Sequence, residues 1–237
     1  MYKDKTFLAI VPARAGSKRL VNKNSLELNG KPLISYSLEA AKKSKFIDNT
    51  IVSTDSKELL EMAKKMKFEV PFLRPKYLSS DTASLVDVTI HAVNSLKDLN
   101  KEYDYIILLQ PTSPFRKAEH IDESICLMDE KKAEAIISVC ETAHSPLWTN
   151  TLGQDNSMSD FLDKSIINKQ SQELEKFYSL NGAIYIIKTD TLMREKKFFL
   201  DKEIYAYIMD KKSSLDIDDE YDFLYAETII NNIGEIK

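Results

Sequence analysis

Four cations surround one glycine near the start of the chain, in the stretch PARAGSKRLVNKN. They are Arg14, Lys18, Arg19 and Lys23, placed around Gly16 directly after an apolar run. Long cationic side chains neutralise charge and unpaired backbone N–H groups donate hydrogen bonds, so such a loop suits phosphate groups. A solvated basic surface is the alternative, and these residue types alone favour neither interpretation.

The loop lacks the two best-known glycine-rich phosphate motifs. Gly16-Ser17-Lys18 puts serine before lysine, whereas the Walker A pattern needs glycine directly before a Lys-Ser/Thr pair, and the chain has no GxGxxG. If phosphates bind here, the cationic side chains must do more of the work than the backbone.

Two carboxylates alternate in the segment SLDIDD near the end of the chain. If this segment is extended, Asp216 and Asp218 point to the same face, where they repel each other unless a cation intervenes. One or two carboxylates beside phosphate oxygens suit Mg²⁺. The alternative is that Asp218 and Asp219 cap the helix that follows.

Apolar runs and amphipathic stretches alternate along most of the chain, which predicts a parallel sheet covered by helices on both faces. The expected strands are 6–11, 50–53, 105–109, 135–139, 183–187 and 205–209, and the expected helices are 32–43, 57–66, 84–96, 119–130 and 220–231. In such a sheet, ligands bind beyond the carboxyl ends of the strands.

Three polar segments follow expected strands and therefore fall at that edge. The basic loop follows the first strand, Asp55 the second, and Gln110-Pro111-Thr112-Ser113-Pro114 the most apolar one. The two prolines stiffen the last loop and fix the direction of Gln110, although an ordinary proline-containing loop is the alternative.

The stretch from Glu141 to Leu180 breaks the alternation. It is polar and without clear period, but Trp148, Phe161 and Ile166 give it apolar surface. A structureless loop of this length is uncommon in a compact domain, so we expect an ordered protrusion that helps to form a homodimer. A disordered loop is the alternative.

Composition bounds the class of protein. The 237 residues, 43% of them hydrophobic, fit one α/β domain with an elaboration. A net charge of -4 with intermixed signs gives no reason to expect nucleic-acid or membrane-surface binding. Two separated cysteines, Cys126 and Cys140, and an N-terminus without signal-peptide or membrane-spanning character indicate a cytoplasmic protein.

Six segments, in order, resemble those of the acylneuraminate cytidylyltransferase family, the CMP-sialic acid synthetases. They are ARAGSKRLVNKN, LNGKPLI, RPKYLSSDTAS, LQPTSPFR, NGAIYI and SLDIDD. The resemblance implies a Rossmann-like three-layer α/β/α nucleotidyltransferase fold with a mostly parallel sheet. It also implies one domain over residues 1–237, with residues 141–180 as a small protruding dimerisation insertion.

The resemblance also implies a set of site residues. Arg14, Lys18, Lys23, Asp216 and Asp218 are expected to be catalytic. The nucleotide is expected to meet Arg14, Asn24, Arg74, Ser84 and Gln110. The sugar is expected to meet Gln110, Tyr185, Phe198 and Phe199, although aromatic residues near strands are more often core. The metal ligands are expected to be Asp216 and Asp218.

The implied reaction joins CTP and a nine-carbon 2-keto sugar acid to give the CMP-sugar and pyrophosphate, with Mg²⁺ as cofactor. Legionaminic and pseudaminic acids are alternative substrates. A 3-deoxy-manno-octulosonate cytidylyltransferase is less expected, because that family has VQGDEP where this chain has LLQPTSPF. A catalytically silent nucleotide-binding homologue has little need of the two aspartates.

The sequence departs from the family pattern just before NGAIYI. The family usually has arginines there, but this stretch reads NKQSQELEKFYSL. Lys169 or Lys176, Arg194, or a residue of a partner subunit are the candidate replacements, and a reduced activity or an altered substrate is the other expectation. Lysine supplies charge but not the two-pronged hydrogen bonding of arginine.

Overall fold

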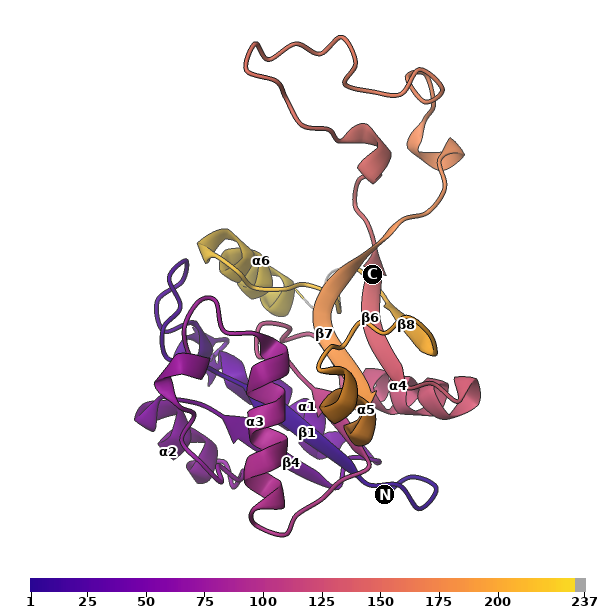
Figure 1. The fold of residues 1–237 in the computed structure, drawn as a ribbon. Coiled ribbons are helices and arrows are strands. Elements are labelled where there is room, and N and C mark those ends of the chain that lie inside the picture. The colour runs from indigo at the N-terminus through magenta and orange to yellow at the C-terminus, as the bar shows by residue number, and fades with distance from the viewer. Residues whose placement is uncertain (233–237) are drawn as a thin grey trace.

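The core is one mixed β-sheet with strand order β4-β1-β5-β7-β6-β8. A computed structural model describes residues 1–232 (Figure 1). The strands are β1 (Phe7–Pro12), β4 (Asn49–Ser53), β5 (Tyr105–Leu108), β6 (Ala135–Glu141), β7 (Tyr178–Lys188) and β8 (Ile204–Met209). All of them run in the same direction except β7, which is antiparallel to both of its neighbours.

Helices cover both faces of this sheet and make three layers. One face packs against α1 (Leu33–Lys43), α2 (Lys57–Lys65) and α4 (Ala118–Lys131). The other face packs against α3 (Leu85–Lys97) and α5 (Thr189–Glu195). Strand β1 supplies Phe7, Ala9 and Val11 to the first core cluster and Leu8 and Ile10 to the second. Burial on both faces explains why β1 reads as a continuous apolar run.

A third, smaller apolar cluster lies at the end of the sheet. It joins α6 (Glu220–Asn231) to α1 and to the hairpin of β2 (Glu27–Leu28) and β3 (Lys31–Pro32). Pro32 precedes α1 rather than lying in its first turn. The remaining short helices are η1 (Lys23–Ser25), η2 (Lys76–Leu78), η3 (Pro146–Trp148) and η4 (Ser171–Glu173).

The sheet is mostly parallel, as the family resemblance implies, and β7 is the strand that runs against its neighbours. Strand β6 runs out of the sheet beside the start of β7, with Cys140 paired to Ser179, and the chain returns along it. Strand β7 then inserts between β5 and β6. The apolar pattern of a strand buried on both faces does not reveal whether it runs parallel or antiparallel to its neighbours. The structure also begins β7 at Tyr178, whereas the sequence pattern begins this strand at residue 183.

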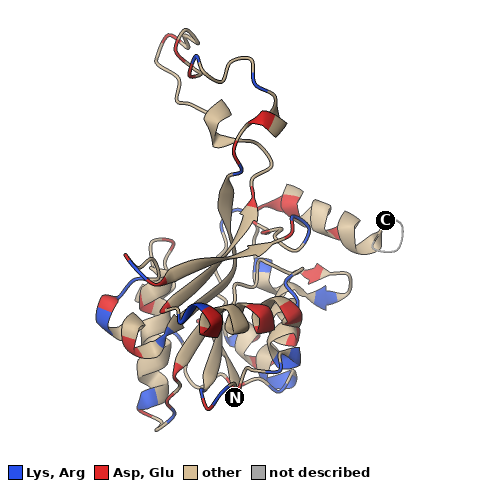
Figure 2. Ribbon diagram, turned by 90° about the vertical axis from the view of Figure 1, so that its right-hand side faces the viewer, with Lys and Arg blue, Asp and Glu red and all other residues tan. Residues whose placement is uncertain are grey.

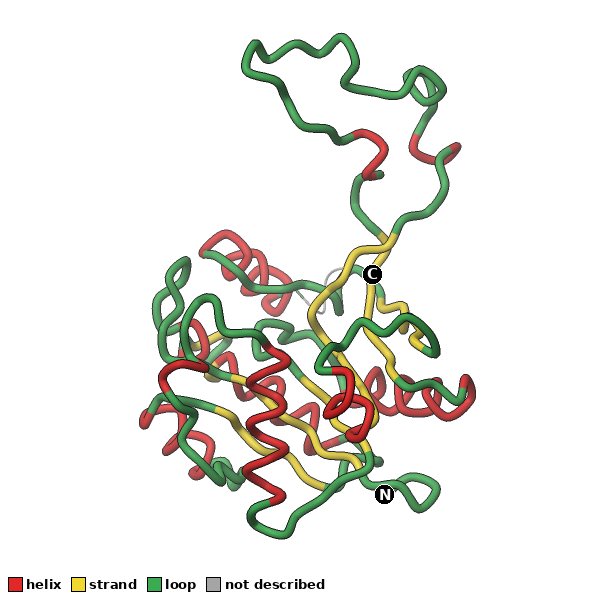
Figure 3. Tube along the Cα trace, viewed as in Figure 1, coloured by secondary structure: helices red, strands yellow, loops and turns green. Residues whose placement is uncertain are grey.

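The segment between β6 and β7 projects away from the rest of the molecule (Figure 1). Apart from η3 and η4 it is loop throughout (Figure 3). The expected range of 141–180 includes strand residues at both ends, so the loop itself covers residues 142–177. Its role in dimerisation and the single-domain assignment stay predictions.

Charged residues of both signs are distributed over the whole ribbon (Figure 2). Within residues 1–232, no helix has both the length and the apolarity required to cross a bilayer.

Candidate active site

A cleft of about 600 Å³ opens beyond the carboxyl ends of β1 and β5. Most of the residues that the sequence assigns to the site line it: Arg14, Lys18, Lys23, Asn24, Arg74, Gln110, Asp216 and Asp218. Arg19, Asp81 and Thr112 also line it. The cleft therefore presents five cations and three carboxylates, a balance that suits a polyanion.

The basic loop is held in place by its own backbone. Asp55 accepts a hydrogen bond from the Ala15 N–H at 2.9 Å, and the Asn24 amide donates to the Arg14 carbonyl at 3.0 Å. Asp55 thus positions the loop and is not part of the cleft lining. A Cβ added at Gly16 meets nothing within 4 Å, so the chain itself does not require a glycine there.

Asp81 joins the two cations at the outer end of the cleft. Its carboxylate lies 2.8 Å from the Arg14 guanidinium and 2.5 Å from the Lys18 ammonium. Hydrogen bonds from Lys18 and Arg14 hold the Asp81 pKa below its ordinary value. A carboxylate therefore takes the position between two cations that a phosphate group would suit.

Lys23 connects the basic loop to the acidic segment. Its ammonium donates to the Ile217 carbonyl at 2.7 Å and lies 3.2 Å from Asp218. Arg19 approaches the same carboxylate at 3.4 Å. Two cations, Lys23 and Arg19, therefore contact the Asp218 carboxylate.

Asp216 is a partly buried carboxylate whose buried oxygen, Oδ1, has no hydrogen-bond partner among the described residues. Burial raises its pKa, the charge of Asp218 adds to this rise, and Thr112 and Lys23 oppose it. A buried oxygen without a partner costs free energy unless a ligand satisfies it. Within residues 1–232 no three acidic, histidine or cysteine side chains cluster in a way that could hold a metal ion.

Three contacts hold the acidic segment in place, although it is not a β-strand. Ile217 is fully buried in the third apolar cluster, and its N–H donates to the Thr112 carbonyl at 2.8 Å. Asn181 donates to the Ser214 hydroxyl at 2.9 Å. Asp219 caps α6 by accepting hydrogen bonds from its first turn, so the capping interpretation holds for this aspartate.

Arg74 is buried in the cleft wall. Its guanidinium donates to the carbonyls of Ser53 and Leu78. Burial lowers its pKa to about 10, the charge of Arg14 contributes to this lowering, and Asp55 opposes it.

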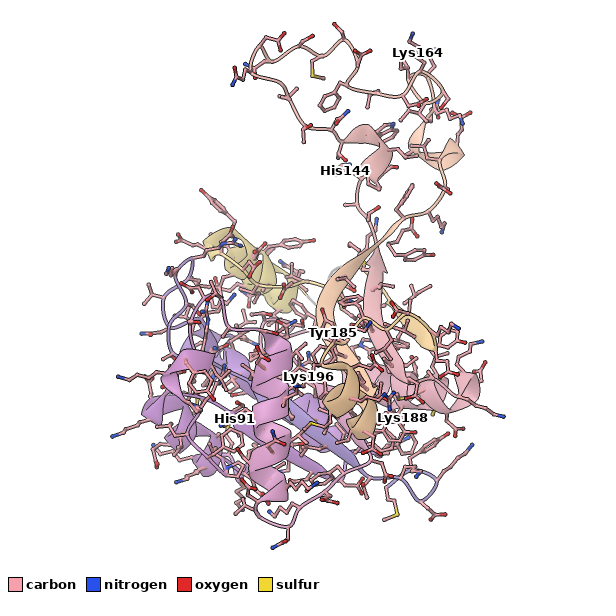
Figure 4. The ribbon with its side chains drawn as sticks, viewed as in Figure 1. His91, His144, Lys164, Tyr185, Lys188 and Lys196 are labelled. Atoms are coloured by element: carbon pink, nitrogen blue, oxygen red, sulfur yellow. The ribbon has the colours of Figure 1, made fainter. Side chains whose placement is uncertain are left out.

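Four expected site residues lie outside the cleft lining. Ser84 caps α3 by accepting from the Val86 N–H. Tyr185 and Phe198 belong to the second core cluster, with ring centroids 5.4 Å apart. Phe199 is exposed. Tyr185 lies on β7 in the body of the molecule (Figure 4), where burial raises its pKa and the charge of Asp216 adds to this rise.

The candidate replacements for the missing arginines are not brought to the cleft. Lys176 pairs with Glu141 at 3.1 Å, Arg194 pairs with Glu195 at 3.0 Å on α5, and Lys169 is exposed on the projecting loop.

Sequence reasoning did not single out Asp81 and Arg116 individually, although both lie within quoted segments. Asp81 lies in RPKYLSSDTAS and Arg116 ends LQPTSPFR. The signal for Asp81 was an acidic residue in a segment assigned to nucleotide binding. The signal for Arg116 was an arginine at the end of the loop that follows a buried strand.

A family model described as cytidylyltransferase matches residues 8–231. The chain belongs to the cytidylyltransferase family. An N-acylneuraminate cytidylyltransferase of Escherichia coli O18:K1:H7 is 41% identical over 94% of this chain and 51% of its own length. A CMP-N,N'-diacetyllegionaminic acid synthase of Legionella pneumophila is 32% identical over 94% and 95% of the two chains.

The chain spans about half the length of the first of these relatives. The solved structure of a CMP:2-keto-3-deoxy-manno-octonic acid synthetase complexed with CTP superimposes with a TM-score of 0.72. It covers 96% of this chain and 99% of its own at 16% identity. That likeness confirms the nucleotidyltransferase fold.

Proposed function

We propose that this cytidylyltransferase activates a nine-carbon 2-keto sugar acid, converting CTP and an N-acylneuraminate into the CMP-sugar and pyrophosphate. The observation that carries this proposal is the meeting of a basic loop, a proline-stiffened glutamine loop and a carboxylate pair in one cleft. The family match and the 41% identical relative support it.

In this proposal the chain accelerates the reaction by alignment and charge stabilisation. Arg14, Lys18 and Lys23 bind the triphosphate, and Arg74 and Asn24 shape the nucleotide end of the cleft. The anomeric hydroxyl of the sugar acid attacks the α-phosphorus in line with the departing pyrophosphate. Gln110 lines the same cleft and orients the sugar. Ser84, Tyr185, Phe198 and Phe199 stay proposed binding residues that a closed, liganded form must recruit.

The acidic segment fits Mg²⁺. Asp216 has a buried oxygen without a partner among the described residues, and Asp218 lines the same cleft. When bound, Mg²⁺ supplies positive charge to the phosphate oxygens. Lys23 and Arg19 already contact Asp218 and limit the repulsion between the two carboxylates.

The identity of the acyl sugar rests on similarity alone, and the legionaminic acid relative supplies the second candidate. Pseudaminic acid is a third. A silent nucleotide-binding role stays less favoured, because it leaves the partnerless oxygen of Asp216 unexplained.

We also propose a homodimer joined by the projecting loop. Exposed apolar side chains on that loop support it: Leu147, Leu152, Met158 and Ile167. The proposed compartment is the cytoplasm, since Cys126 and Cys140 are both free thiols.

Pyrophosphate release from CTP and Mg²⁺ with a panel of eight- and nine-carbon sugar acids tests the proposed function. We expect release with at least one nine-carbon acid, and its loss in Asp216→Asn. Release with none overturns the enzyme proposal, and release only with the eight-carbon acid overturns the substrate class.

A further inference from the structure

Arg116 is a buried cation for which the described residues provide no acidic partner. Its side chain is 2% exposed, and burial alone lowers its pKa to about 9. Taking a guanidinium out of water without a carboxylate is unfavourable, and a methionine of similar volume avoids that penalty. The hydrogen bonds that the guanidinium makes must therefore offset the cost of burying it.

The Arg116 guanidinium binds three elements at once. One nitrogen donates to the Gln110 carbonyl at 3.1 Å and to the Ala183 carbonyl at 2.8 Å. The other donates to the Ser37 hydroxyl on α1, which itself donates to the Gln110 carbonyl at 3.0 Å. The fork of arginine thus ties the loop after β5 to β7 and to α1, which a single ammonium does not reproduce.

These contacts hold the main chain of Gln110 in place. Gly182 lies directly beside the side-chain amide of Gln110. Gly182 has a φ of +69°, and a Cβ there would lie 3.1 Å from the Gln110 Nε2 and 3.9 Å from an Asp216 oxygen. Glycine is therefore required both for the left-handed backbone and for the close approach of the amide. The Gln110 side chain enters the cleft between the Arg116 contacts and Gly182.

We infer that Arg116 is a positioning residue that sets the direction in which the Gln110 side chain enters the cleft. Gln110 in turn orients the sugar acid, a step that rests on the proposed function. Arg116 itself does not line the cleft, so it acts only through Gln110 and β7.

Arg116→Lys tests this inference because it keeps the charge and removes the fork. Ile121→Ala on α4 is the matched control: Ile121 is fully buried, and its truncation lowers stability without touching Gln110. Should Arg116→Lys fail to fold, Gly182→Ala tests the same arrangement from the side-chain end.

The first measurement needs no activity. The chain has four glutamines, Gln110, Gln154, Gln170 and Gln172, and the last three lie on the projecting loop. In protein labelled with ¹⁵N-glutamine, the Gln110 side-chain amide is identified by its loss in Gln110→Glu. We expect this signal to move or broaden in Arg116→Lys and in Gly182→Ala, and to stay in place in Ile121→Ala. An unmoved signal in Arg116→Lys, or in Gly182→Ala where that variant replaces it, overturns the inference.

The second measurement is steady-state kinetics. We expect Arg116→Lys to raise KM for the sugar acid about tenfold and KM for CTP by a smaller factor, because the sequence places Gln110 against both substrates. An unchanged KM for the sugar acid overturns the positioning role. If the wild-type protein turns over no sugar acid, the proposed function fails, and the amide signal alone decides the role of Arg116.

Discussion

Asp81 is the residue whose position changes the interpretation of the basic loop most. It bridges Arg14 and Lys18, which the sequence assigns to the triphosphate. A bound phosphate must compete with this carboxylate for the same donors, so the two cations are not free in the structure described here.

Asp81→Asn removes the competing charge and keeps the shape of the side chain. We expect CTP to bind about three- to tenfold more tightly, a difference on the scale of one exposed ion pair. Isothermal titration calorimetry measures this, with Asp98→Asn at the exposed end of α3 as the matched control. Weaker binding in Asp81→Asn would mean that the carboxylate organises the cations instead.

Arg14→Ala tests the developing charge directly. The removal of a donor aimed at transition-state charge costs about 3 to 4 kcal/mol, so kcat/KM should fall by about two to three orders of magnitude. Arg194→Ala is the control, because that arginine is exposed and lies outside the cleft. A loss below about tenfold makes Arg14 a bystander.

At the scale of elements, Glu134 fastens the junction of β6, β7 and α5. It accepts hydrogen bonds from Lys188 at the end of β7 and from Thr191 in α5. Burial alone raises the pKa of Glu134, but the hydrogen bonds from Lys188 and Thr191 outweigh it and hold the pKa below its ordinary value. This junction supports the far end of the strand whose start borders the cleft.

Glu134→Gln should therefore destabilise the fold in a pH-dependent way. A lowered carboxyl pKa stabilises the fold above its unfolded value, and the effect disappears as pH falls through the folded pKa. We expect a loss of about 1 kcal/mol at pH 7, because Lys188 stays partly solvated, and a shrinking difference below about pH 4. Urea unfolding measures it, and Glu141→Gln in the exposed pair with Lys176 is the control. A difference that is constant with pH contradicts the assignment.

At the scale of the whole molecule, the loop between β6 and β7 projects away from the other elements (Figure 1) and exposes apolar side chains. Within the loop, Ile166 is buried and Asn150 donates to the Phe161 carbonyl at 3.2 Å, so part of it packs on itself. The exposed remainder is the part available to a second subunit.

Deletion of residues 148–167 should convert the proposed dimer to a monomer. Multi-angle light scattering measures the mass, and Tyr221→Asp on the exposed side of α6 should leave it unchanged. An unchanged dimer after the deletion removes the loop from the interface, and a monomeric wild-type protein removes the dimer itself.

Local pattern determined much of this protein. The strands, most helices and the family follow from apolar periodicity and from six short segments, and eight of the twelve expected site residues do line one cleft. The strand and fold predictions succeed because burial on both faces of a sheet leaves a continuous apolar run in the sequence. The eight residues lie together because loops that follow parallel strands meet at the carboxyl edge of the sheet, and their roles stay predictions.

Tertiary structure alone decided what depends on residues distant in the chain. Strand β7 lies between two strands from other parts of the chain and runs against them. Asp81 contacts two cations of the basic loop, and Arg116 binds the carbonyls of Gln110 and Ala183. The buried oxygen of Asp216 likewise depends on segments that are distant in the sequence. Residue type predicts which charge or hydrogen bond a side chain offers. Only the packing of the sheet determines which partner it finds and how much water remains around it.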